Sequence, residues 1–256
     1  MGRVSPGAPA VRTVAKGQTV TVSEIFGPVI QGEGGVIGRP TVFVRTGGCD
    51  YRCSFCDSLF AVLPEHRGSW RKMGTEEIFG EVRRLSPEPI LVTLSGGNPA
   101  LQPLGDLIRR GRERGYTFAI ETQGTVSKPW FAELDHLTIS PKPPSSKMET
   151  DWEKLDLCVA AGGTGTEVIL KVVVMDDVDY VYAREVAARY PGVPMYLQVG
   201  NDNPPGAAPD DATEPDVSGL LDRYAWLAEK VVADRWNGVT VLPQLHVLVY
   251  GNRRGV

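Results

Sequence analysis

The sequence of 256 residues lacks most of the features that would place a protein in a membrane, outside the cell or on nucleic acid. No apolar run approaches the roughly 18 residues that a membrane-spanning helix requires. The formal net charge is −4, so the chain lacks the basic excess of nucleic-acid-binding domains. Only four cysteines are present, and residues 1–18 lack the apolar segment of a signal peptide. We therefore expect a protein of the reducing cytoplasm, with a flexible tail at 1–18 and a single domain at 19–256.

Three of the four cysteines stand close together. Cys49, Cys53 and Cys56 follow the spacing C-x3-C-x2-C in the segment GGCDYRCSFCDS. Thiolates this close in sequence can bind one soft metal centre, either zinc or an iron–sulfur cluster. Three thiolates cannot complete a four-coordinate site or cap every iron of a 4Fe–4S cube, so one metal position stays open, as in catalytic sites. We expect the fourth cysteine, Cys158, to be a buried and inert thiol.

Two plainer interpretations compete with a cluster. The cysteines could be small core residues, but Asp50, Arg52 and Asp57 among them argue against an apolar core segment. A structural zinc site would need a fourth ligand, and the nearest candidate is His66. The cluster is the favoured interpretation, and the zinc site remains an alternative.

Predicted strands and helices alternate along the chain. Apolar and β-branched runs predict strands at 19–25, 41–45, 90–94, 117–121, 137–140, 167–175, 195–199 and 239–242. Helical periodicity predicts helices that begin near Thr75 and cover 101–114, 178–190 and 220–236. The segments 26–40 and 201–216 are rich in glycine or proline and predict loops, the second one exposed.

This alternation is typical of an α/β fold, in which helices cover a parallel sheet. Six strands in series, from the one at 41 to the one at 195, predict an open, partial barrel of the TIM type. Each of these strands ends in a polar or glycine-rich motif. Barrels of this kind place their active sites at those strand ends. We therefore expect the motifs to meet at one mouth of the barrel.

The motifs resemble those of known enzymes. The cysteine spacing after a strand resembles the signature of the radical S-adenosylmethionine (radical SAM) superfamily, and SGGNP at 95–99 resembles its GGEP-type motif, with Asn98 where Glu is commoner. The wider set, from about Val22 to the C-terminus, resembles the 7-carboxy-7-deazaguanine synthase family. It comprises FGPVIQGEG, GRPTVFVRTGGC, CDS, SGGNP, ETQGT, SPK, LQVGN and PQLHVLVYGN.

The resemblance implies the radical SAM fold and a ring contraction. Its cofactors would be a 4Fe–4S cluster on the three cysteines, S-adenosylmethionine at the open iron, and Mg²⁺. Reductive cleavage of S-adenosylmethionine would give a 5′-deoxyadenosyl radical, with no further catalytic residue. The substrate would be 6-carboxy-5,6,7,8-tetrahydropterin, which loses ammonia to give 7-carboxy-7-deazaguanine for 7-deazaguanine and queuosine biosynthesis. A homodimer and an electron donor such as flavodoxin or ferredoxin are also implied.

The resemblance also assigns residues. The positions that match substrate contacts are Ile30, Gln31, Gly32, Arg45, Ser95 and His246. The positions that match contacts to S-adenosylmethionine are Phe55, Asp57, Gly97, Ser140, Pro141, Lys142, Leu197, Gln198, Val199 and Gly200. Ser58 matches the Mg²⁺ ligand, which is usually Thr, and its hydroxyl is a suitable hard donor. Glu121 ends a strand, where we expect its carboxylate to accept hydrogen bonds from ribose hydroxyls.

Two alternative functions stay open at this point. Another radical SAM enzyme, such as a glycyl-radical activase, would share the cysteine motif but would act on a protein. A non-catalytic protein would use the cysteines for a structural zinc. Convergent polar groups such as Arg45 and Gln31 favour a small pterin over a peptide groove.

Overall fold

The computed structural model describes residues 18–208, 211 and 213–256. The tail expected at 1–18 lies almost entirely outside these residues. The strands are β1 (Val20–Ile30), β2 (Pro40–Thr46), β3 (Arg71–Met73), β4 (Leu91–Gly96), β5 (Thr117–Thr122), β6 (His136–Ile139), β7 (Glu167–Val174), β8 (Met195–Val199) and β9 (Val239–Leu242). The α-helices are α1 (Leu59–Val62), α2 (Thr75–Leu85), α3 (Gly105–Arg112), α4 (Trp152–Ala160), α5 (Asp177–Arg189), α6 (Val217–Ala233) and α7 (Leu245–Tyr250). Short 3-10 helices are η1 (Gly34–Val36), η2 (Pro64–Ser69), η3 (Pro99–Leu101), η4 (Pro129–Glu133) and η5 (Pro144–Ser146).

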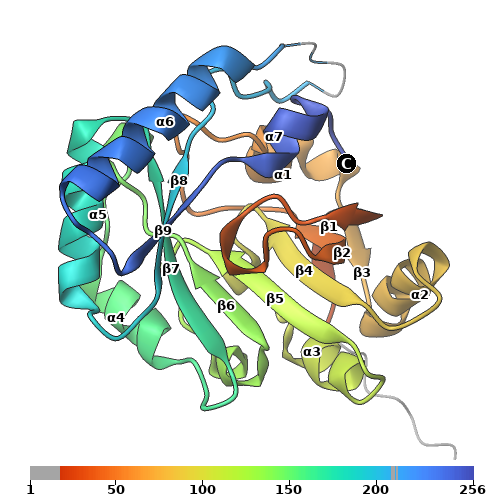
Figure 1. The fold of residues 1–256 in the computed structure, drawn as a ribbon. Helices are drawn as coiled ribbons and strands as arrows, with labels where there is room; N and C mark the ends of the chain where they lie inside the picture. The colour runs from red at the N-terminus through yellow and green to blue at the C-terminus, as the bar shows by residue number, and fades with distance from the viewer. Residues whose placement is uncertain (1–17, 209–210, 212) are drawn as a thin grey trace, which may run out of the picture.

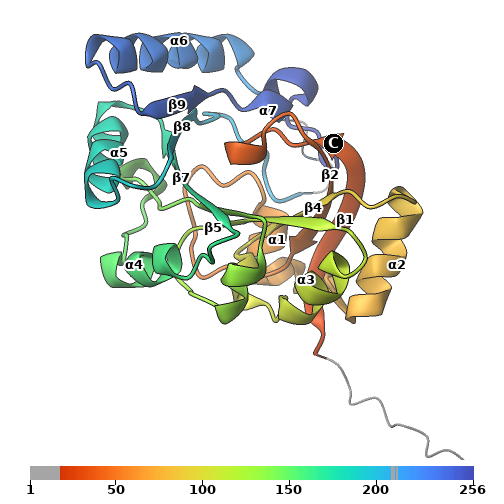
Figure 2. The same cartoon turned by 60° about the horizontal axis from the view of Figure 1, so that its bottom comes forward.

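One sheet organises the described part of the chain, with nine strands in the order β3-β1-β2-β4-β5-β6-β7-β8-β9. From β2 to β9 each neighbouring pair is parallel, while β1 pairs antiparallel with both β2 and β3. Helices α2 to α6 lie around the outside of the curved sheet (Figures 1 and 2). The strands β3 and β9 form its two edges, so the sheet stays open, as the sequence predicts.

The two faces of the sheet differ in chemistry. The outer face forms the main hydrophobic core with the helices, and Val172, Val174 and Leu197 belong to it. The inner face carries polar side chains such as Thr93 and Lys171, which line a cavity. Alternate residues of a strand point to opposite faces, so a strand buried on both sides can supply core and cavity together. Within the described residues, no helix combines the length and apolar character needed to cross a membrane.

Several predicted boundaries were wrong for identifiable reasons. Strand β1 continues to Ile30 through residues that we expected to form a loop, because a register shift between Phe26 and Val29 lets the irregular glycine–proline stretch stay paired with β2. Helix α2 is capped by Gly74 rather than Thr75, and the Gly74 N–H donates to the Glu77 carboxylate at 2.6 Å. Helix α3 begins at Gly105 rather than near 101, because Gln102 precedes a proline and is extended.

Other elements were missed or miscounted. Strand β9 pairs in parallel with β8 and gives seven parallel strands rather than six in the described sheet. Helix α4 was not predicted, although Asp151 caps it by accepting from the Lys154 N–H at 3.1 Å. The loop at 201–216 is not uniformly exposed. Asn201 is buried, and Pro204 and Pro205 are half-buried and line the cavity, so the expectation of an exposed loop is wrong at these residues, whereas Asp202, Asn203 and Ala208 are exposed.

Candidate functional site

A cavity of about 610 Å³ lies on the inner side of the sheet. This volume is in the range of small-molecule sites, roughly 300–1,000 Å³. Residues after the parallel strands line it, together with the segment after β1, the cysteine loop between β2 and α1, and helix α7. The motifs that are far apart in sequence therefore meet at one mouth, as the pattern of strand ends predicts.

The three clustered cysteines occupy one corner of this cavity. Cys49, Cys53 and Cys56 all line it and are half-buried, whereas Cys158 is fully buried in the hydrophobic core. Burial raises the pKa of all three cavity thiols, that of Cys56 to about 12, and nearby carboxylates add to the effect: Asp50 at Cys49 and Cys53, and Asp57 at Cys56. Three sulfurs gathered at the wall of a cavity fit a single iron–sulfur cluster.

Glycines hold the turn after β4 against the cysteine loop. A Cβ atom on Gly97 would lie 2.1 Å from the carbonyl oxygen of Gly48, so only glycine fits there. The N–H of Asn98 donates to the same carbonyl at 2.8 Å. The missing side chain of Gly97 therefore allows the turn after β4 to approach the cysteine loop at Gly48 this closely.

The side chain of Asn98, which stands where Glu is commoner in this motif, bonds to the protein itself. An amide oxygen at this position can accept from an ammonium group. The oxygen of Asn98 instead accepts from the Ala100 N–H at 3.1 Å and the Thr122 hydroxyl at 2.9 Å. The residue is fully buried, so its amide acts inside the protein.

Arg45 lies at the centre of a polar chain along the cavity wall. Its Nε is 2.9 Å from Glu24 Oε1, and its Nη1 donates to Ser58 Oγ at 2.6 Å. Ser58 in turn donates to Asp57 Oδ1 at 2.8 Å. The guanidinium also lies 5.4 Å and 5.5 Å from the ring centres of Phe26 and Phe60, which limits its movement.

A buried lysine, which the sequence analysis missed, joins two carboxylates of the cavity. Lys171 on β7 contacts Glu33, and its Nζ lies 2.6 Å from Glu121 Oε1. Burial alone would raise the pKa of Glu33, but Lys171, His246 and the hydrogen bonds from Lys171 and Gln244 together outweigh burial and hold that pKa well below its usual value. Burial likewise opposes the charge of Lys171, but the two carboxylates raise its pKa above the usual value. We call Glu33, Lys171 and Glu121 the charged triad.

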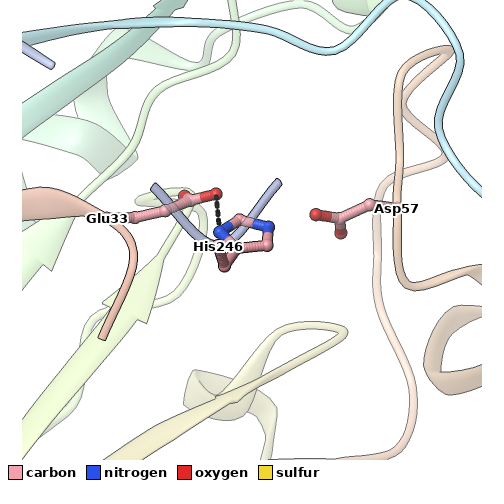
Figure 3. A group of neighbouring side chains, drawn as sticks. All are labelled: Glu33, Asp57 and His246. Atoms are coloured by element: carbon pink, nitrogen blue, oxygen red, sulfur yellow. Dashed lines mark ion pairs between the residues drawn. The ribbon is translucent and has the colours of Figure 1, made fainter. Parts of the chain in front are cut away.

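Glu33 also connects the triad to helix α7. Its Oε1 accepts from Gln244 Nε2 at 3.1 Å and lies 3.8 Å from His246 Nδ1. Figure 3 shows His246 between Glu33 and Asp57, and one ligand atom from each of the three lies within 4.8 Å of the others. The position of Gly32 explains this proximity, since its Cβ would come within 2.6 Å of the His246 ring. The two segments therefore pack closely around one side of the cavity.

Most of the sequence-predicted site residues line the cavity. They are Ile30, Gln31, Gly32, Arg45, Phe55, Asp57, Ser58, Ser95, Gly97, Glu121, Ser140, Lys142, Gly200 and His246, together with the three cysteines. Pro141, Leu197, Gln198 and Val199 are buried next to it without lining it. The side chains of Leu197 and Val199 belong to the core, so only their main chain can reach a ligand.

Several buried polar atoms have no hydrogen-bond partner. Within the described residues, these are Glu24 Oε1, Arg45 Nε, Ser95 Oγ, Gln244 Oε1 and both amide atoms of Gln198. Glu24 Oε1 and Arg45 Nε nevertheless lie 2.9 Å apart as an ion pair. Gln198 pairs in register with Val173, a residue of the cavity lining, so both side chains leave the same face of the sheet. Buried polar groups are normally satisfied, so Ser95, which lines the cavity, fits contact with a bound polar molecule.

Comparison with known proteins decides the family. Residues 43–158 match the model of the Radical SAM superfamily. The chain is 49% identical over 249 residues to the 7-carboxy-7-deazaguanine synthase of Bacillus subtilis (strain 168), covering 95% of this chain and 100% of that protein. It is 47% identical to the enzyme of the same name from Bacillus cereus, covering 93% of this chain and 99% of that protein. The chain belongs to the 7-carboxy-7-deazaguanine synthase family.

A solved structure agrees on the fold. The crystal structure of QueE from Escherichia coli superposes with a TM-score of 0.64 over 89% of this chain and 95% of that chain, at 20% identity. Membership of the 7-carboxy-7-deazaguanine synthase family makes the chain a radical SAM enzyme, with a 4Fe–4S cluster and S-adenosylmethionine as its cofactors. Neither the glycyl-radical activase nor the zinc-binding alternative gains support from these similarities.

Proposed function

We propose that this chain converts 6-carboxy-5,6,7,8-tetrahydropterin to 7-carboxy-7-deazaguanine with loss of ammonia. The observation that carries the proposal is that one cavity brings together the three cysteines, the SGGNP turn and Arg45. Relatives that align over the whole length bear the name of this enzyme. The cavity volume of about 610 Å³ is in the range of small-molecule sites, which suits a small heterocycle better than a peptide.

In this proposal Cys49, Cys53 and Cys56 hold the cluster. When bound, the cluster and S-adenosylmethionine supply a carbon radical that removes a hydrogen atom from the substrate. The protein contributes position and exclusion of water. Gln198 offers the cofactor a buried amide without a protein partner, and the close packing of Gly97 on the cysteine loop keeps that wall fixed.

Arg45 and Ser95 are proposed to hold the substrate. The guanidinium has five N–H donors, so it can bind a carboxylate while Glu24 and Ser58 hold its Nε and Nη1. Ser95 adds a buried hydroxyl that lacks a partner among the described residues. The segment 30–32 and His246 close the same side of the cavity.

Ser58 is proposed as the protein ligand of Mg²⁺. Its hydroxyl is buried in the cavity wall beside the Asp57 carboxylate, and Glu33 adds a further oxygen nearby. Hard oxygen donors of this kind suit Mg²⁺. A hydroxyl oxygen has two lone pairs, so Ser58 can bind the metal and still accept the hydrogen bond from Arg45.

An anaerobic assay tests the proposal. Reconstituted protein is incubated with the pterin, S-adenosylmethionine, Mg²⁺ and dithionite, and we expect the deazaguanine product. Arg45→Ala should abolish pterin turnover and leave the reductive cleavage of S-adenosylmethionine intact. Arg39→Ala, which removes an exposed contact to His136 at 2.7 Å, is the matched control and should turn over normally. Turnover by Arg45→Ala would contradict the substrate assignment.

The finer expectations about partners belong to the same proposal. They are an external one-electron donor such as flavodoxin or ferredoxin, a homodimer, and a location in the cytoplasm. Magnesium dependence of the assay tests Ser58, since Ser58→Ala should raise the Mg²⁺ concentration needed for half-maximal turnover.

A further inference from the structure

A buried amide in the cavity wall touches one of the three cysteines directly. Gln123 follows strand β5 and is only 6% exposed. Its Nε2 donates to Asp50 Oδ1 at 2.6 Å and to Cys49 Sγ at 3.6 Å. An amide nitrogen carries two hydrogens, so these two contacts use both.

Asp50 is held by a second buried amide. Asn98 Nδ2 donates to the same Asp50 Oδ1 at 3.0 Å, and also to Thr125 Oγ1 at 3.1 Å. The cysteine loop is thereby tied to the turns that follow β4 and β5. The amides hold Asp50 beside Cys49, so a negative charge stays fixed near the cluster ligand.

Cys49 Sγ receives two N–H donors. One comes from Gln123, and the other is the Tyr51 main-chain N–H at 3.4 Å. Hydrogen bonds to the sulfurs of an iron–sulfur cluster favour the reduced state, because they stabilise the added negative charge. A neighbouring carboxylate acts in the opposite direction, and the amide of Gln123 partly offsets the charge of Asp50.

We propose that Gln123 is a positioning residue of the iron–sulfur site that raises the reduction potential of the cluster through its N–H···S bond to Cys49 and its hold on Asp50. This proposal rests on the proposed function, because it requires a cluster on Cys49. The redox step itself is a one-electron reduction of the oxidised cluster by an added reductant, with no bond made or broken in the protein.

The chain offers a matched control for this role. Gln102 also anchors the cysteine loop, since its Nε2 donates to the Gly47 carbonyl at 3.0 Å and its Oε1 accepts from the Thr21 N–H at 3.0 Å. These hydrogen bonds involve no sulfur atom. A change at Gln102 therefore loosens the same loop without removing a donor from Cys49.

The experiment compares wild type, Gln123→Met, Gln123→Glu and Gln102→Met after anaerobic reconstitution. Iron and sulfide per chain are measured first, and the cluster is then titrated with dithionite in the absence of S-adenosylmethionine and pterin. We expect both Gln123 variants to load the cluster and to have more negative midpoint potentials than wild type, with Gln123→Glu the lower of the two. Gln102→Met should keep the wild-type potential.

Three results would overturn the proposal. The first is a loaded Gln123 variant with the wild-type potential. The second is an equal shift in Gln102→Met, which would mean that loop anchoring alone sets the potential. The third is failure of both Gln123 variants to load iron while Gln102→Met does, which would make Gln123 a residue of cluster retention. If wild type itself binds no iron, the proposed function fails instead.

Discussion

Replacing Lys171 by methionine removes the only cation of the charged triad while keeping the length of the side chain. Lys171 is 1% exposed, and the carboxylates that it contacts, Glu33 and Glu121, are 18% and 31% exposed. Without the lysine, two carboxylates share a poorly solvated region. Breaking a buried ion pair by removing one partner destabilises proteins by about 3–5 kcal/mol.

Because Glu121 is partly exposed, we expect the free energy of unfolding to fall by about 3 kcal/mol, near the lower end of this range. In a chain of this size, 1 kcal/mol lowers the melting temperature by roughly 2–4 °C, so we expect a decrease of roughly 6–12 °C in Lys171→Met. Lys154→Met is the matched control. Lys154 is 57% exposed and pairs with Asp151 at 2.8 Å, and solvent screens such a surface pair. Its melting temperature should stay close to that of wild type.

The dependence on pH gives a second, independent check. In wild type the pKa of Glu33 is lowered from its usual value of 4.5, so its contribution is present above pH 4.5 and is lost as the pH falls through the lowered value. The pKa of Lys171 is raised from 10.5, so its contribution is present below pH 10.5 and is lost as the pH rises through the raised value. The triad therefore stabilises the wild type across the neutral range.

In Lys171→Met the sign at Glu33 reverses. Burial, the largest single influence on Glu33, is then opposed only by His246 and the hydrogen bond from Gln244, so we expect the pKa of Glu33 to rise above that of the unfolded chain and protonation to favour the folded variant. The difference in melting temperature between wild type and variant should therefore shrink from pH 7 to pH 5. Circular dichroism melts of the metal-free chain at the two pH values measure this. A decrease no larger than that of Lys154→Met, or a difference independent of pH, would refute the reasoning.

Three further predictions concern the cysteine loop, the turn that packs on it, and the fourth cysteine. Gly97→Ala should lower the iron content after reconstitution, because its Cβ would lie 2.1 Å from a carbonyl oxygen of that loop, whereas Gly165→Ala, with nothing within 4 Å, should load normally. Asn98→Asp should destabilise the metal-free chain by about 1–3 kcal/mol, because it replaces a donor to Asp50 with a second carboxylate, and adding Asp50→Asn should recover most of the loss in a urea melt. An unchanged stability in Asn98→Asp would disprove that network. Cys158→Ala should retain the full iron content of wild type, and a loss of iron would show that this core thiol takes part in cluster binding.

The sequence predicted the elements whose signal is local. The strands at Met195–Val199 and Val239–Leu242 have the predicted bounds, because β-branched and apolar runs between turn residues leave little ambiguity. The cysteine loop was placed at the mouth because strand ends in a parallel sheet share one edge. Strand β1 was cut short at 25 because its glycines and proline are typical of a loop, and only pairing with β2 keeps them extended.

The contacts across the cavity could not be predicted in the same way. Lys171 could have been recognised from the sequence, since it is the lone charge in the apolar run VILKVVV of β7. The partners of Lys171 could not be predicted from the sequence, because Glu33 lies 138 positions away and contacts Lys171 only when the sheet curves. The network of Asn98 was hidden for a similar reason. Its motif resembles a cofactor contact, while its partners lie in the cysteine loop, at the end of β5 and in the turn after β5.

The wall formed by Glu33 and Gln244 joins residues that are 211 positions apart, whereas the sulfur-bearing corner is built from neighbouring strands. Bringing together residues so far apart in the sequence costs more loop-closure entropy, so we expect the contact between Glu33 and Gln244 to form later in folding than the strand pairs. Binding of the cluster and binding of the pterin should therefore be separable properties. Damage that detaches α7 would abolish pterin binding and still leave the three cysteines able to hold iron.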